Sequence, residues 1–542
     1  MQHSDGVVST YPLDNLHVEI NRLLGPVWTR DSYSAFLPRY LRPLPSRLDR
    51  GDVDFLVKAG AFDIYEPPVC EALLRSYIHH VHPHVPFLDL DWFLSCVVDS
   101  EGSSNHNRDS DASISLLLFN AIMFAGALFV DMNGLYAAGF LSRREACASL
   151  HRRARALYDL DCEDDALIVI QSLLLMSYWY EDMDTHKDGR YWIGICVSLA
   201  QSIRLDCDQV EYLDYHARFQ KRLWWCIYTR DRLIALGLQQ PPIIDDILRQ
   251  SMPMVTPGDF DPVHATPRLQ YILGSFSNHQ ISLSRVFIEK SKLCRLVASR
   301  ILRWREEDAS AIDLVILDFE LCKQDLSQWE TDLPPGIQWY PEHATEVTNG
   351  GILHGHRAWL RLVFLELSFT VTRRLQALSR NSLTYSYAER QLLESTLQLT
   401  AWKVTDVLDG LNKQNMTDQL PTTAVALICR TCITVLRGMQ PQTLCIEATS
   451  VRRFRICVSA LKNLARLYGS ATLLSTIFGR RCAAWECESS ADKILSDVDL
   501  EALSRLTLQS TWPTIPRVLT IRDPYCIDIV SQLRLQRLRR VC

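Results

Sequence analysis

The hydrophobic positions between Phe219 and Asp246 repeat at the spacing of a long α-helix. One apolar face follows steps of three and four residues and comprises Phe219, Leu223, Cys226, Ile227 and Ile234. A second face places a carboxylate among large rings and comprises Trp224, Tyr228, Asp231 and Ala235. A third face is polar and comprises Arg218, Lys221, Arg222 and Thr229. We therefore expect a helix that is covered from more than one side and ends at Gly237 and the Pro241-Pro242 pair.

Helical periodicity recurs along most of the chain, and no alternating strand pattern interrupts it. The expected helices cover 13–24, 52–59, 69–81, 113–130, 143–158, 166–180, 191–206, 275–333, 354–378, 386–411, 422–439 and 451–468. Short polar turns join consecutive segments, as between helices that pack side by side. We predict an all-α fold, an array of antiparallel helical hairpins that forms one large helical body.

Proline content divides the chain into three parts. Residues 1–68 contain Pro38, Pro43, Pro45 and the Pro67-Pro68 pair, which is typical of an irregular arm with short helices laid over a larger body. We expect residues 69–260 to form the core of this body and residues 261–542 to continue it.

The apolar run 113–130 is the one candidate for a membrane span. It is 18 residues long, at the lower limit for crossing a bilayer, and it contains Asn120 and Gly126. Asp109 and Asp111 precede it where flanking basic residues would be expected. A buried core helix is therefore the prediction, with no membrane partner.

Composition supports a globular protein that is not strongly basic. Apolar residues make up 47% and charged residues 22% of the 542 residues, and the formal net charge is −6. This balance gives no support to direct DNA contact over most of the surface. The 17 cysteines are scattered, mostly in apolar runs, and the first residues lack the apolar core of a signal peptide. We expect buried thiols in a reducing, intracellular setting.

The long helix carries a recognisable series of residues in a fixed order. The series is Lys221-Arg222, Trp224-Trp225, Asp231, Gly237 and Pro241 through Asp246. It resembles the signature helix of the fungal-specific transcription factor regulatory domain, the middle homology region, and this resemblance implies that residues 69–260 form the core of that domain. The segment 36–62 resembles the segment that precedes the domain in cutinase-transcription-factor-like members. The departure is Gln239-Gln240, where the family usually has Arg before Pro.

The resemblance implies a nuclear transcription regulator that controls a metabolic gene set, such as a secondary-metabolite cluster. Its expected partners are other transcription factors or coregulators, in a homodimer or heterodimer, and a small-molecule effector bound near Trp179, Tyr180 and Trp192. The signature residues Arg222, Trp224, Trp225, Asp231, Gly237, Pro241 and Pro242 are expected to fix the fold.

Family members usually begin with a six-cysteine cluster that binds two zinc ions and reads DNA. No cysteine precedes Cys70, and the one C-x-x-C pair, Cys429 and Cys432, lies in an apolar helix. We therefore expect no cofactor here, and zinc only with an N-terminal zinc cluster outside this sequence. DNA would be reached through such a module, through a complete partner factor, or not at all if the chain acts as a competitor.

A helical enzyme or a small-molecule-binding protein is the alternative. Isoprenoid cyclases hold magnesium with aspartate-rich motifs, but Asp164-Asp165 and Asp245-Asp246 each lack a third acid. The chain also has no nucleophile elbow, phosphate-binding loop or dinucleotide-binding turn. We expect no catalytic residues and no enzyme activity.

Asp231 is the signature residue that most clearly requires a partner. A carboxylate beside Trp224 and Tyr228 cannot stay unpaired once it is buried. We expect it to pair with an arginine or to accept backbone N–H groups at the start of a neighbouring helix.

Overall fold

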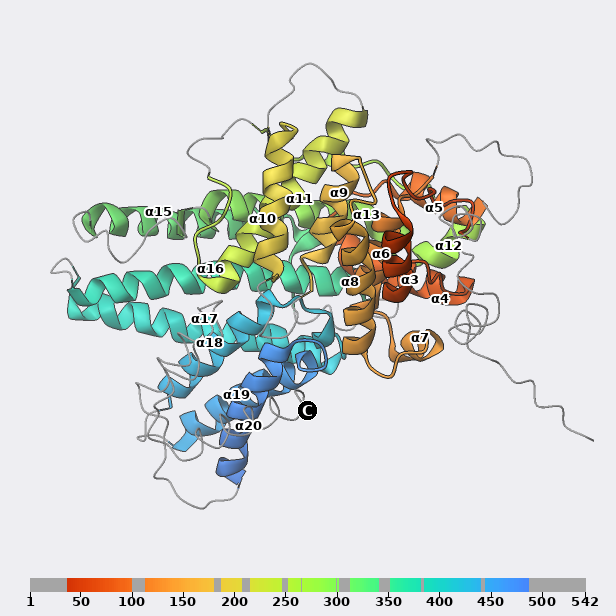
Figure 1. The fold of residues 1–542 in the computed structure, drawn as a ribbon. Helices are drawn as coiled ribbons and strands as arrows, with labels where there is room; N and C mark the ends of the chain where they lie inside the picture. Colours follow the sequence, from red (N-terminus) through yellow and green to blue (C-terminus); the bar gives the residue numbers. More distant parts are fainter. Residues whose placement is uncertain are drawn as a thin grey trace, which may run out of the picture.

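The computed structural model describes residues 37–99, 113–179, 187–206, 215–245, 252–264, 266–298, 300–301, 312–340, 351–381, 385–439 and 444–486. Within these ranges the chain forms helices and no β-strand, with one isolated parallel bridge between Leu41 and Ile114. The predicted all-α fold is confirmed (Figure 1). The short helix expected at 13–24 lies outside the described residues.

Helix boundaries follow the hydrophobic periodicity closely. The α-helices are α3 (Arg50–Ala59), α4 (Pro67–Ser76), α5 (Leu90–Asp99), α6 (Leu116–Ala127), α7 (Met132–Ala137), α8 (Arg143–Asp159), α9 (Ala166–Met176), α10 (Gly189–Ser202), α11 (Tyr215–Leu238), α12 (Pro267–Leu273), α13 (Phe276–Leu293), α15 (Ile312–Asp332), α16 (Ile352–Asn381), α17 (Tyr387–Lys413), α18 (Thr423–Arg437), α19 (Leu444–Leu464) and α20 (Gly469–Glu486). Short π or 3-10 turns are η1 (Tyr77–Val81), η2 (His82–His84), η4 (Pro257–Asp259), η5 (Cys294–Ala298), η7 (Pro335–Ile337) and η9 (Thr417–Gln419).

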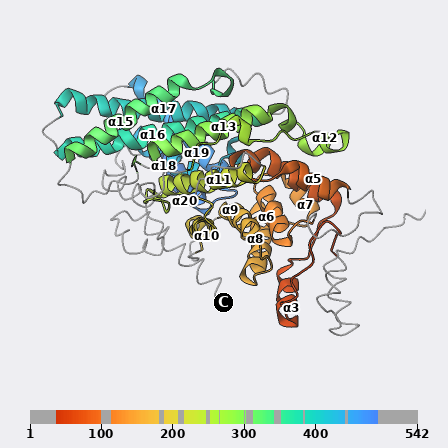
Figure 2. The same ribbon diagram turned by 90° about the horizontal axis from the view of Figure 1, so that it is seen from above.

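Helices that follow one another in the chain pack against each other. The pairs α9 with α10, α16 with α17, α18 with α19, and α19 with α20 are all in contact, as helical hairpins require. Helix α11 contacts α10 on one side and α13 and α18 on the other. Figure 2 shows α11 between the layer that contains α13, α16 and α17 and the layer that contains α6, α8 and α10.

Helix α6 confirms the buried-core interpretation of the apolar run 113–130. All of its residues from Leu116 to Ala127 are buried. The one polar side chain among them, Asn120, donates to the carbonyl oxygens of Ala61 at 3.2 Å and Leu116 at 3.0 Å. No described helix combines the length and the apolar character that crossing a membrane requires.

Helix α4 crosses α6 at Gly126, where the two backbones nearly touch. A Cβ atom on Gly126 would lie 2.2 Å from the carbonyl oxygen of Leu73. Next to this contact, the Ser76 hydroxyl donates to the Gly126 carbonyl at 2.7 Å. Glycine is therefore required here for close approach and not for backbone freedom.

We predict that Gly126→Ala lowers the free energy of unfolding by about 3 kcal/mol, because the new methyl group forces α4 and α6 apart. The matched control is Gly479→Ala in α20, where an added Cβ has no atom within 4 Å and the gain in helix propensity is stabilising. Thermal denaturation followed by circular dichroism measures both. A melting temperature for Gly126→Ala equal to that of the wild type would contradict the close crossing.

Candidate functional site

Helix α11 is enclosed by the rest of the protein. Every residue from Arg222 to Leu236 is buried, so the expectation that the helix is covered from more than one side is confirmed. The polar third face is also covered at Arg222 and Thr229, whose exposed fractions are 4% and 1%. Packing on all sides leaves no solvent-facing stripe over these four turns.

The first half of α11 is held by the segment that follows it in the chain. Lys221 Nζ pairs with Asp259 Oδ2 at 2.9 Å, and the Arg222 guanidinium donates to the Asp259 carbonyl and lies 3.3 Å from Asp261 Oδ2. Arg218 pairs with the other oxygen of Asp261 at 3.0 Å. The carbonyl of Pro253 accepts from the Trp225 indole N–H at 2.8 Å. The basic pair and the second tryptophan thus fasten residues 253–261 along the helix.

The second half of α11 carries a buried ion pair between neighbouring residues. Asp231 Oδ2 lies 2.6 Å from Arg232 Nη1, and both side chains are at most 1% exposed. The Asp231 oxygens also accept from the backbone N–H groups of Ile243 at 2.9 Å and Ile244 at 3.1 Å. Arg232 in turn donates to the Ile244 carbonyl at 3.0 Å, which closes a cycle of hydrogen bonds among these residues. We call these four residues the Asp231 clamp.

The clamp confirms the predicted arginine partner of Asp231 and corrects the second half of that prediction. The N–H groups belong to the loop after α11 and not to the start of a neighbouring helix. Burial raises the pKa of Asp231, and the charge of Arg232 together with the two backbone N–H groups offsets part of that rise. The carboxylate therefore fixes the direction in which the chain leaves the signature helix.

The end of α11 differs from the prediction. Gly237 lies inside the helix, which continues to Leu238. Gln239 then adopts a left-handed conformation with φ of 51°, and the backbone N–H of Gln240 donates to the Ala235 carbonyl at 3.0 Å. A Cβ on Gly237 would lie 3.2 Å from a methyl carbon of Thr423, so this glycine lets α18 approach. Pro241 and Pro242 follow the turn and do not end the helix.

Two of the three expected effector-pocket residues come together in the core. Trp179 and Trp192 both lie near the buried His151, with ring centroids 6.5 Å and 5.7 Å from its imidazole. Their exposed fractions are 4% and 0%, and neither indole N–H has a hydrogen-bond partner among the described residues. Tyr180 lies outside the described residues.

The sequence did not indicate a cavity of about 70 Å³ at the first half of α11. Its walls include His82, Asp91, Arg222, Phe260 and Gln280, which come from separate segments of the chain. Only Arg222 among them belongs to the signature series. No local pattern could have shown that these segments meet.

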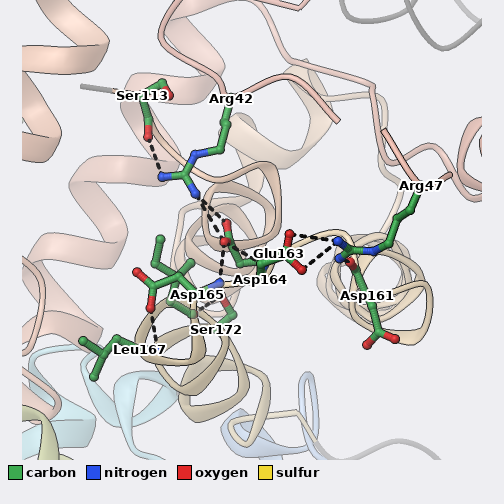
Figure 3. A network of polar contacts seen from close by, with 10 residues as sticks. Arg42, Arg47, Ser113, Asp161, Glu163, Asp164, Asp165, Leu167 and Ser172 are labelled. Atoms are coloured by element: carbon green, nitrogen blue, oxygen red, sulfur yellow. Dashed lines mark hydrogen bonds and ion pairs between the residues drawn. The ribbon is translucent and has the colours of Figure 1, made fainter. Parts of the chain in front are cut away.

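The acidic residues before α9 serve the fold. Arg42 donates to Glu163 at 3.2 Å, and Arg47 pairs with Asp164, which lowers the pKa of that carboxyl group (Figure 3). Asp165 caps α9 by accepting from the Leu167 N–H at 2.8 Å. The Asp164-Asp165 pair thus holds an arginine and a helix start in place.

The sequence also contains two dense basic runs, 452–455 and 533–540, and the C-x-x-C pair of Cys429 and Cys432. Arg453 stacks over Trp402 at 5.1 Å and donates to Asp406 at 2.7 Å, so part of the basic run 452–455 is neutralised. Cys429 and Cys432 are buried in α18. The basic run 533–540 lies outside the described residues.

We predict that Asp231→Asn lowers the free energy of unfolding by about 3 kcal/mol. The amide removes the charge beside Arg232 and leaves one acceptor oxygen for three donors. Asp409→Asn is the control, because Asp409 pairs with Lys413, which is 68% exposed, and such pairs contribute less than about 1 kcal/mol. Chemical denaturation of both variants measures the difference, and equal stabilities would show that the clamp does not support the fold.

Comparison with known proteins places this helical arrangement in a family. The model of the fungal specific transcription factor domain matches residues 74–402, a range that begins in α4 and ends in α17. Helix α11, the segment it holds and the Asp231 clamp all lie inside this range.

Individual relatives agree. Cutinase transcription factor 1 beta from Fusarium vanettenii is 29% identical over 83% of this chain and 53% of its own length. Transcription factor cpaR from Aspergillus oryzae is 30% identical over 74% of this chain and 69% of its own length. Fusaric acid cluster transcription factor FUB12 from Gibberella moniliformis is 25% identical over 34% of this chain and 26% of its own length. The chain spans about half the length of the first of these relatives, and it belongs to the fungal specific transcription factor domain family.

Proposed function

We propose that this chain is the helical regulatory body of a fungal transcription regulator, and that it acts in the nucleus. The observation that carries the proposal is the family match over residues 74–402, which has the signature helix α11 at its centre. The names of the relatives, all transcription factors, point to a regulator and not to an enzyme.

The genes under its control are proposed to be a metabolic set, including a secondary-metabolite cluster. The name of the relative from Gibberella moniliformis, a fusaric acid cluster factor, supports this part of the proposal. Partners are proposed to be other transcription factors or coregulators, including a second copy of this chain. DNA contact is assigned to a zinc-cluster module, in the same protein or in a partner.

The way in which the structure uses its charged residues supports a regulatory and not a catalytic role. On α11, Arg222 and Asp231 form hydrogen bonds with the two segments that follow the helix. Before α9, Asp164 pairs with an arginine and Asp165 caps the helix. Such arrangements make a rigid platform whose outer surfaces are available for protein partners.

A fusion experiment tests the function directly. We predict that the chain, fused to a heterologous DNA-binding domain in a fungal reporter strain, changes reporter expression several-fold relative to that domain alone. Asp231→Asn is expected to return expression to the level of the domain alone, because the regulatory body loses its central clamp, while Asp409→Asn keeps the effect. Reporter expression equal to that of the DNA-binding domain alone, at matched protein levels, would contradict the proposal.

A further inference from the structure

Two buried cations face the same small hollow between α11, α13 and α18. Lys290 of α13 is 3% exposed and Arg230 of α11 is 4% exposed. Both line a hollow of about 10 Å³, together with His84, Thr229 and Thr423. That volume accommodates one water-sized group.

Neither cation has a counter-charge among the described residues. Lys290 Nζ donates to the His84 carbonyl at 2.8 Å, which leaves two of its three N–H groups unused. Arg230 donates through Nε and Nη2 to Ser177, at 3.0 Å and 2.7 Å, and its guanidinium lies 4.0 Å from the centre of the Tyr178 ring. These contacts are all to neutral groups.

The titratable groups that act on Lys290 add no negative charge at pH 7. They are Cys226 and Arg230 on α11, Cys294 after α13, His84 in η2 and His356 on α16. Burial raises the pKa of both thiols and lowers the pKa of both imidazoles, so these four groups are neutral at pH 7. Burial also lowers the pKa of Lys290, to about 8, which leaves it mainly charged at pH 7. A buried charge without a counter-charge is costly to the fold.

The start of α18 adds a hydroxyl donor to the same hollow. The Thr423 hydroxyl oxygen is buried and has no hydrogen-bond partner in the described chain. Thr423 is the first residue of α18, and the residue before it provides no side-chain cap. The backbone N–H groups of Ala424 and Val425 already donate to the carbonyl oxygens of Pro421 and Thr422, so the start of α18 offers an anion its dipole. Two cations, an unused hydroxyl and the positive end of a helix dipole therefore line one hollow.

We propose that this hollow binds one small monovalent anionic group, either a halide ion or one oxygen of the carboxylate of a small ligand. Lys290 and Arg230 supply the charge, and Thr423 supplies a hydroxyl donor. The bound group would link η2, α11, α13 and α18 at the second half of the signature helix. If it serves as the effector site of the regulator, that role rests on the proposed function; binding itself is independent of it.

The test is thermal denaturation of the purified full chain at fixed ionic strength, with sodium chloride or sodium acetate replacing a bulky organic sulfonate. We expect the melting temperature to rise saturably with the small anion, as for a ligand that binds only the folded state. A stronger effect of acetate would identify a carboxylate site, and equal effects would identify a site for any small monoanion. No saturable rise with either anion overturns the proposal.

Substitutions separate binding from general salt effects. Lys290→Met should raise the melting temperature in the sulfonate buffer, because it removes an uncompensated buried charge, and should weaken anion affinity at least about tenfold, the effect of about 1.4 kcal/mol. Lys292→Met is the matched control on α13, since Lys292 is 44% exposed and pairs with Glu289, and should leave the affinity unchanged. An unchanged anion response in Lys290→Met overturns the proposal.

A second variant tests binding with a smaller risk of disturbing the fold. Thr423→Val removes a hydroxyl that has no partner, so the fold should keep its stability in the sulfonate buffer. Its anion affinity should fall several-fold. Because this readout is binding by the purified chain, its failure is distinct from failure of the reporter experiment. An affinity equal to that of the wild type would show that the anion does not reach the start of α18.

Discussion

The constraint on which the structure depends is the complete burial of a helix that carries charges. Helix α11 lies between the two layers of the body, and every residue from Arg222 to Leu236 is buried. Each charge on it must then find a partner inside the protein. Those partners come mainly from the two segments that follow α11, so the helix fixes the course of the next stretch of chain as well as its own position.

The signature series gains a physical meaning from this arrangement. The basic pair and the second tryptophan hold residues 253–261, and Asp231 with Arg232 holds Ile243 and Ile244. Gly237 allows α18 to approach from the opposite side. A change at any of these positions would alter contacts with a different layer, which explains how one short stretch can determine the relation between distant helices.

Hydrophobic periodicity predicted the fold class and most helices, because a helix that buries one face has apolar residues at regular three- and four-residue spacing. The expected helix 143–158, for example, is Arg143–Asp159 in the structure. It did not predict α5, α7, α12 or α20, and the apolar residues of α20 form no clear stripe. The segment 275–333 was expected to be continuously helical, but α13 ends at Leu293 and a π turn follows.

The site was only partly predictable. The need of Asp231 for a partner follows from its apolar neighbours, and so it could be derived. The burial of Arg222 could not, because its partner Asp259 lies 37 positions away and nothing local indicates that the chain returns. For the same reason, the sequence could not show that Arg230 and Lys290 line one hollow. They lie on different helices, and only the packing of those helices brings them together.

Native-state hydrogen exchange on the full chain tests the central claim most directly. If α11 is the enclosed element on which both layers depend, its amides between 222 and 236, together with those of Ile243 and Ile244, should exchange in the slowest group, through global unfolding. Amides of the peripheral helices α7 and α20 should exchange earlier. Exchange of the α11 amides before those of α7 and α20 would contradict the account.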